Sequence, residues 1–138
     1  MLPLPPTEQS LLLRTDFSDD RAWESVRAAV QRPSGLFHAN LHILSDPAYR
    51  DLTLDQIQSL APPGSPHTFL FVVDRETLGR PDHPVLVVDL FDQRGRTFRV
   101  APAAIGSVEN NLSIANMDFE EFADAVDEDG VFRGFPRG

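Results

Sequence analysis

The 138-residue sequence contains neither cysteine nor lysine. Without cysteine, the chain cannot be a disulfide-stapled scaffold, hold a thiolate zinc site or use a cysteine nucleophile. Without lysine, it has no Schiff-base residue and no phosphate-loop lysine. All 12 basic residues are therefore arginine, which stays charged and binds carboxylates or phosphates through paired hydrogen bonds.

Long apolar runs and familiar catalytic motifs are missing as well. No segment reaches the roughly 18 apolar residues that cross a bilayer. The glycine-rich phosphate loops and the Gly-x-Ser-x-Gly turn are absent, so no catalytic residue is named by a motif. The N-terminus lacks the basic and apolar regions of a signal peptide, and we therefore expect a cytoplasmic protein without a membrane partner.

The net charge is strongly negative, −9 from 21 acidic and 12 basic residues. A negative surface repels a phosphate backbone, so we expect no nucleic-acid partner. The apolar fraction of 41%, with ten phenylalanines, is enough for a hydrophobic core at this length.

The hydrophobic pattern predicts one domain of the α/β or α+β class. Its order is β-α-β-α-β-β-β-α-α, with a mixed sheet of about five strands and helices packed on it. The expected strands are 11–17, 36–44, 67–74, 85–91 and 96–100, and the expected helices are 19–31, 54–60, 103–109 and 118–130. Residues 1–10 are expected to form an extended arm, and 11–135 a single globular domain.

Three stretches together resemble a known family. They are Leu13–Asp20 followed by Trp23, Val87–Leu90, and Ser107–Phe122. They are similar to small bacterial proteins, common in GC-rich Gram-positive genomes, that are grouped as a domain of unknown function. The resemblance covers most of residues 11–135 and implies a bacterial, cytoplasmic, single-domain protein. It supplies no catalytic residues.

Carboxylates follow the first expected strand and form one candidate site. Asp16, Asp19 and Asp20 could hold Mg²⁺, which prefers oxygen ligands. Arg14 or Arg99 would then bind the anionic part of a substrate. The alternative is structural, because acids in a first helical turn are favoured by the helix dipole.

Two further acids, Asp74 and Asp89, end expected strands and could contribute to the same metal site. The turn at 92–95 makes the strands on either side of it antiparallel. If strand 67–74 is also antiparallel to strand 85–91, Asp74 and Asp89 lie at opposite edges of the sheet. The alternative role for both is to organise the turns that follow them.

A polar segment, residues 109–116, is a second candidate site. It is expected to be irregular, with side chains that both donate and accept hydrogen bonds. Together with Arg14, its candidate ligand-binding residues are Glu109, Asn110, Asn111, Ser113 and Asn116. The alternative is a network that satisfies the ends of the neighbouring helices.

The last expected helix is acidic throughout. Between residues 101 and 131 there are eight acids and no base. Four of them, Asp124, Asp127, Glu128 and Asp129, crowd the helix end, where negative charge opposes the dipole. Arg133, an arginine of the 85–100 strands or a basic partner protein could offset this charge, and the alternative is a solvated face.

We therefore expect a non-enzymatic binding or adaptor domain that recognises a protein with a basic surface through its own acidic surface. One alternative is a small Mg²⁺-dependent enzyme acting on an anionic or phosphorylated small molecule. The other is a small-molecule sensor that uses residues 109–116. The binding-domain expectation needs no cofactor.

Overall fold

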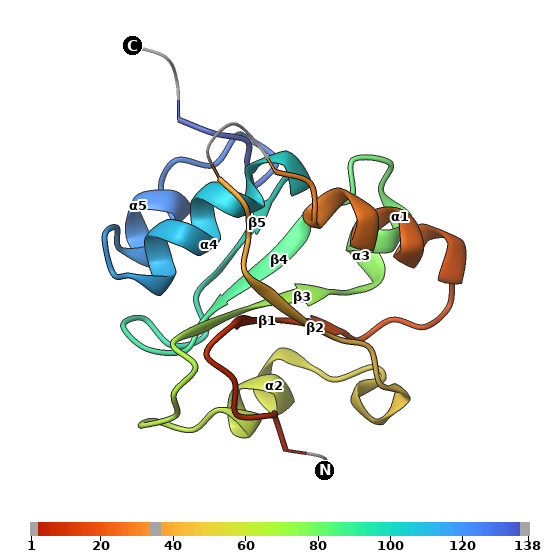
Figure 1. Cartoon of the computed structure of the whole chain (residues 1–138), viewed down its shortest axis with the longest axis horizontal. Helices are drawn as coiled ribbons and strands as arrows, with labels where there is room; N and C mark the ends of the chain where they lie inside the picture. The colour runs from red at the N-terminus through yellow and green to blue at the C-terminus, as the bar shows by residue number, and fades with distance from the viewer. Residues whose placement is uncertain (1–2, 34–36, 136–138) are drawn as a thin grey trace.

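A computed structural model describes residues 3–33 and 37–135, which form a six-stranded sheet in the order β2-β1-β3-β4-β5-β6 (Figure 1). The strands are β1 (Ser10–Arg14), β2 (Leu41–Leu44), β3 (Phe69–Val73), β4 (Val85–Asp89), β5 (Thr97–Val100) and β6 (Val131–Phe132). The helices are α1 (Asp20–Val30), α2 (Leu54–Leu60), α3 (Arg75–Gly79), α4 (Ile105–Ser113) and α5 (Phe119–Ala123), with short 3₁₀ turns η1 (Pro47–Tyr49) and η2 (Pro102–Ala104). The expected mixed sheet with packed helices is confirmed, with six strands rather than five.

The sheet has a parallel half and an antiparallel half. β1 pairs in parallel with β2 on one side and with β3 on the other. β3, β4 and β5 are successively antiparallel, and β6 is parallel to β5. Every residue of β1 and β3 is buried, as their continuous apolar sequences predict for strands covered on both faces.

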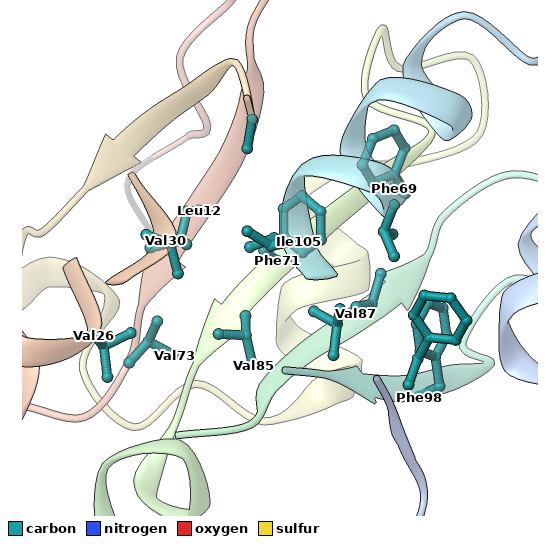
Figure 2. Close-up of a cluster of buried hydrophobic side chains, with 14 of the residues drawn as sticks. Leu12, Val26, Val30, Phe69, Phe71, Val73, Val85, Val87, Phe98 and Ile105 are labelled. Atoms are coloured by element: carbon teal, nitrogen blue, oxygen red, sulfur yellow. The ribbon is translucent and has the colours of Figure 1, made fainter. Parts of the chain in front are cut away.

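Two apolar layers sandwich this sheet because successive strand residues face opposite sides. On one face, Leu12, Phe71 and Val87 point toward α1 and α4 (Figure 2). On the other face, Leu13 and Leu70 pack against α2 and η1. Figure 1 shows α1 and α4 on one side of the sheet and α2 on the other. No helix in the described residues is long and apolar enough to span a bilayer.

The helix starts follow from local side chains. Threonine followed three residues later by glutamine is the sequence pattern of a capping box, and Thr53 with Gln56 forms one at α2: Thr53 Oγ1 accepts from Gln56 N at 3.2 Å, and Gln56 Oε1 accepts from Thr53 N at 2.9 Å. Serine is a favoured N-cap residue and Ser18 precedes the expected helix 19–31, but Ser18 does not cap α1. Asp19 takes that place because its carboxylate reaches Ala22 N at 2.9 Å.

Several expected elements have different bounds. The strand expected over 36–44 is regular only at β2, and residue 36 lies outside the described residues. Helix α3 was expected to be a loop, yet Asp74 caps it and Thr77 closes a capping box. The last helix ends at Ala123 rather than near Gly130, and the chain then forms β6 beside β5.

The N-terminal arm lies against the face that carries α2. Tyr49 Oη donates to the carbonyl of Pro3 at 2.7 Å, and His67 Nε2 donates to the carbonyl of Pro5 at 3.1 Å. Burial, and then the charge of Asp46, raise the pKa of Tyr49. β1 begins at Ser10, the last residue of the expected arm.

Candidate functional site

The carboxyl ends of β1, β2 and β3 lie at one edge of the sheet because these strands are parallel. We call it the carboxyl edge and the opposite one the amino edge. The chain leaves β1 through α1 to reach β2, then returns through α2 to β3 on the other side of β1. Helices α1 and α2 pack on opposite faces. Open α/β sheets bind ligands at such a reversal of strand order.

Arg14, the last residue of β1, is buried at this edge. Its guanidinium carbon lies 4.3 Å from the centroid of the Phe17 ring and 4.9 Å from that of Trp23. Nε donates to the carbonyl of Asp16 at 2.9 Å, and Nη2 donates to Asp20 Oδ1 at 2.8 Å. The Arg14 side chain is 5% exposed and that of Asp20 is 86% exposed, so a buried cation is paired with a carboxylate at the surface.

The three acids expected to bind Mg²⁺ each have a separate structural partner. The Asp16 carboxylate accepts from Ser18 N at 2.9 Å, and Asp19 caps α1. Asp20 pairs with Arg14. Across residues 3–33 and 37–135, no three histidine or acidic side chains are grouped so that they could hold a metal ion. Asp19 and Asp20 thus lie at the start of α1, as the structural alternative expects, and Mg²⁺ binding stays a prediction.

Asp74 follows β3 at the carboxyl edge and forms a partly buried network of ion pairs. Its Oδ2 accepts from Arg99 Nη2 at 2.7 Å, and its Oδ1 accepts from Thr77 N at 3.0 Å. Burial raises the pKa of Asp74, but the hydrogen bonds from Arg99 and Thr77 outweigh it and hold the pKa below its ordinary value of 3.8. Arg99 also pairs with Glu76 at 3.0 Å, so this candidate anion-binding arginine already contacts two carboxylates.

Asp89 lies at the amino edge, since it pairs in register with Phe69 at the start of β3. The expected separation of Asp74 and Asp89 is confirmed. The Asp89 carboxylate accepts from Phe91 N and Gln93 N, both at 2.9 Å. It therefore organises the turn between β4 and β5.

Two crevices open at the carboxyl edge. One, of about 470 Å³, lies between the ends of β1 and β2 and helix α1, and Arg14 forms part of its wall. The other, of about 530 Å³, lies at the ends of β1 and β3. Its lining residues are Thr15, Asp16, Ser18, Asp51, Leu52, Asp74 and Arg75. The second crevice has three acids and one arginine in its lining, whereas the first has two acids and two arginines, Arg14 and Arg27.

Glu109 is buried at the amino edge, at the other end of β1 from Arg14. Its Oε2 accepts from Ser10 Oγ at 2.7 Å, and its Oε1 accepts from the backbone N of Asn40 at 2.7 Å. Within the described residues it forms no ion pair. Glu109 therefore joins α4 to the starts of β1 and β2, and the structure does not bring it together with Arg14.

The other polar residues of 109–116 mostly satisfy nearby backbone. The expected irregular backbone is wrong up to Ser113, because α4 continues to that residue. Asn110 Nδ2 donates to the carbonyl of His38 at 2.9 Å, and Asn111 Nδ2 to that of Ser107 at 2.8 Å. Asn116 Nδ2 donates to Asn111 Oδ1 at 2.8 Å. These contacts form a hydrogen-bond network of the kind expected if the segment has a structural role and not a ligand-binding one.

Three of the four acids that follow α5 form ion pairs with arginines of the same chain. Asp124 Oδ1 lies 2.6 Å from Arg96 Nη2, while Asp127 and Asp129 each pair with Arg133 at 2.8 Å. Arg133 and an arginine of the 85–100 strands thus offset the charge, two of the three possibilities that the sequence left open. The hydrogen bonds that Arg133 donates lower the pKa of Asp129, and the bonds that Asp129 and then Asp127 accept raise the pKa of Arg133. Glu128 is exposed and forms no ion pair in the described chain.

The expected conflict with the helix dipole does not arise for Asp127, Glu128 and Asp129, and it is confined to Asp124, the residue that caps the end of α5. Helix α5 ends at Ala123, so Asp124, Asp127, Glu128 and Asp129 follow the helix instead of lying in its last turn. The side chains of Ala125 and Val126, which follow the helix, pack against the core. A second turn, closed by a hydrogen bond from Gly130 N to the carbonyl of Asp127, then leads into β6.

Two exposed apolar side chains at the amino edge were missed by the sequence analysis. Phe91 is 74% exposed in the turn after β4, and Ile114 is 73% exposed just after α4. Leu90 N donates to the carbonyl of Thr68, and Thr68 and Ser113 line one crevice of about 330 Å³. Ile114 therefore follows a residue that lines this crevice, and Phe91 follows Leu90, whose backbone pairs with a second lining residue, Thr68. A weak signal existed, because each lies beside turn-forming residues.

Comparison with known proteins gives a family but no activity. The family model described as Domain of unknown function (DUF6924) matches residues 9–135. No curated protein matches the chain.

Proposed function

We propose that this chain, which belongs to the DUF6924 family, is a non-enzymatic binding domain that recognises another protein through an acidic surface. The surface consists of Phe91, Asp92, Ile114, Asp118 and Glu120, and we call it the amino-edge surface. Its proposed partner is a protein with a basic surface that also carries apolar side chains.

The exposure of Phe91 and Ile114 is the observation that carries this proposal. Both side chains are about three-quarters exposed at the same edge of the sheet. Single exposed apolar residues are common, but large ones gathered on one surface with polar neighbours favour a protein interface. Neither side chain belongs to the two apolar layers of the fold.

The charges near these side chains support a basic partner. Asp92, Asp118 and Glu120 are exposed, and no arginine within the described residues forms an ion pair with them. Asp124, Asp127 and Asp129 differ, because arginines of the same chain already neutralise them. Of the four acids expected to bind the partner, only Glu128 forms no ion pair in the described chain, and we therefore propose the unpaired acids on and beside α5 as the contact in place of the other three.

The acidic residues expected to serve catalysis or sensing have partners within the fold. Asp16 and Asp19 bind backbone N–H groups, Asp74 pairs with Arg99, and Glu109 joins α4 to two strands. Each contact explains its residue as part of the fold. This geometry favours the binding domain over the Mg²⁺-dependent enzyme and over a sensor built on residues 109–116.

Capture from a cytoplasmic extract, the compartment that we propose for this protein, tests the function at physiological salt. Wild-type protein is compared with the F91S/I114S double variant, with D118N/E120Q and with R75Q, an exposed-residue control at the carboxyl edge. We expect a partner that R75Q retains, that F91S/I114S loses, and that D118N/E120Q binds more weakly. A partner set equal to that of an inert control protein, or one retained by F91S/I114S, would contradict the proposal.

A further inference from the structure

We infer that the crevice between the ends of β1 and β2 and helix α1 binds an oxyanion, the phosphate or carboxylate group of a small molecule, with Arg14 as its main contact. The crevice has a volume of about 470 Å³. Its lining residues are Arg14, Asp20, Trp23, Glu24, Arg27, Ile43 and Ser45. This site lies at the carboxyl edge and is independent of the amino-edge surface.

Arg14 has hydrogen-bonding capacity that the fold does not use. A guanidinium carries five N–H donors. Three of them have acceptors: the carbonyl of Asp16, Oδ1 of Asp20, and Oγ of Ser45 at the long distance of 3.4 Å. One donor on each terminal nitrogen has no acceptor in the described parts of the chain. Each Arg14 nitrogen already has one acceptor, so no buried nitrogen is left unpaired in the described chain, and the second N–H group of each terminal nitrogen is what Arg14 can offer to a ligand in the crevice.

The surroundings of Arg14 hold its guanidinium plane in place. The rings of Phe17 and Trp23 lie within 5 Å of its central carbon, and the carbonyl of Asp16 fixes Nε. Arginine binds carboxylate and phosphate through two parallel N–H donors. A guanidinium whose orientation is already fixed loses little conformational entropy when it binds an anion.

Asp20 occupies the position that we assign to the anion. Its carboxylate reaches Arg14 from the first residue of α1, yet its side chain is 86% exposed. Ion pairs with such an exposed partner are weak, so an external oxyanion can displace it. Arg27 supplies a second positive charge on the crevice wall, and Glu24, 3.7 Å from Arg27, supplies a further negative one.

The single tryptophan of the chain makes this site directly observable. Trp23 contacts Arg14 and lines the crevice, so its fluorescence reports on occupancy. Sodium phosphate and sodium acetate are titrated separately, each against sodium chloride at equal ionic strength. We expect a saturable change in Trp23 emission with at least one of them. A response to phosphate alone assigns a phosphate site, and a response to acetate alone assigns a carboxylate site.

Two matched variants separate the site from a general charge effect. D20N removes the competing carboxylate, and we expect it to lower the Kd about fivefold. E24Q makes the same charge change on the same helix without touching Arg14, and we expect a change below about twofold. F91S/I114S is expected to leave the titration unchanged, so that failure of the amino-edge surface does not affect this test.

The inference is overturned if neither anion changes the emission saturably in wild type and in D20N. It is also overturned if D20N and E24Q tighten binding equally, because charge alone would then explain the effect. R14K keeps the charge but loses the planar pair of donors, and we expect it to weaken binding about tenfold. If R14K does not fold, the comparison of D20N with E24Q decides.

Discussion

The two ends of β1 carry opposite buried charges, and their surroundings differ. At the amino end, Glu109 accepts hydrogen bonds from Ser10 and from the backbone of Asn40, and its contacts join three elements of the fold. At the carboxyl end, Arg14 retains two N–H donors without acceptors in the described chain, and its acidic partner is exposed. Two buried charges of similar accessibility thus differ in what remains available for a ligand.

The comparison extends to the two edges of the sheet. At the amino edge the buried carboxylates of Glu109 and Asp89 already accept hydrogen bonds within the fold, and the exposed side chains Phe91 and Ile114 carry the proposed protein contact. At the carboxyl edge the crevices lie where strand order reverses, and a buried side chain carries the proposed contact with a small anion. The two charged residues at the ends of β1, Glu109 and Arg14, are equally buried, and what distinguishes them is the number of hydrogen-bonding groups that each still has free for a ligand.

E109A should cause the largest loss of folding stability among these variants. Removing this carboxylate leaves the Ser10 hydroxyl and the Asn40 N–H without their acceptors, which should lower the free energy of unfolding by about 2–4 kcal/mol. Urea unfolding followed by circular dichroism measures the loss. E120A, a change at an exposed glutamate, is the control and should alter stability by less than about 0.5 kcal/mol. Equal effects of the two variants would contradict the structural role of Glu109.

D74N, at the carboxyl edge, should lower the free energy of unfolding by about 1–3 kcal/mol, which is less than E109A, because it breaks the pairing with Arg99. The pH dependence gives a second measurement. The folded state lowers the pKa of Asp74, so its stabilisation is present above the ordinary value of 3.8 and is lost as the pH falls toward the folded-state pKa. The stability difference between wild type and D74N should therefore shrink between about pH 6 and about pH 2. A difference that stays constant over this range would contradict the assignment.

The ion pair of Asp124 with Arg96 is more exposed, with side chains 59% and 33% accessible. D124N should therefore lower the free energy of unfolding by less than about 1 kcal/mol. Added salt should remove most of that difference, because exposed charges are screened. Thermal unfolding of both proteins at low and high salt measures it, and a loss as large as that of D74N would show that this acid has a structural role.

The smallest effect on stability is expected from F91S and I114S. Both side chains are largely exposed, so each change should alter the free energy of unfolding by at most about 0.5 kcal/mol. This result would sharpen the contrast between the edges, since a variant that loses a partner without losing stability acts through binding. A loss above about 2 kcal/mol in urea unfolding would instead place these residues in the fold.

Much of the fold could be predicted because it depends on local patterns. The apolar runs of β1 and β3 require burial on both faces, and Thr53 with Gln56 marks the start of α2. Short elements were harder to predict. The two residues of β6 form a strand only because β5 is beside them, and the five-residue α3 was hidden in a polar segment.

The candidate residues were identified by type, whereas their roles depend on partners distant in sequence. Glu109 contacts Ser10, 99 positions away, and Asp74 contacts Arg99, 25 positions away. The sequence placed Arg14 with residues 109–116 because each is polar and could bind a ligand. Packing separates them to opposite ends of β1, which no local pattern could indicate.

By itself, the sequence determined the lysine-free, acidic composition, the mixed αβ order and most strand and helix positions. These properties follow from residue type and from hydrophobic period, which are local. Only the tertiary structure decided which charges are paired, which donors of Arg14 remain unused and which apolar side chains stay exposed at the amino edge. Those properties depend on distances between residues far apart in the chain, and such distances exist only once the sheet has assembled.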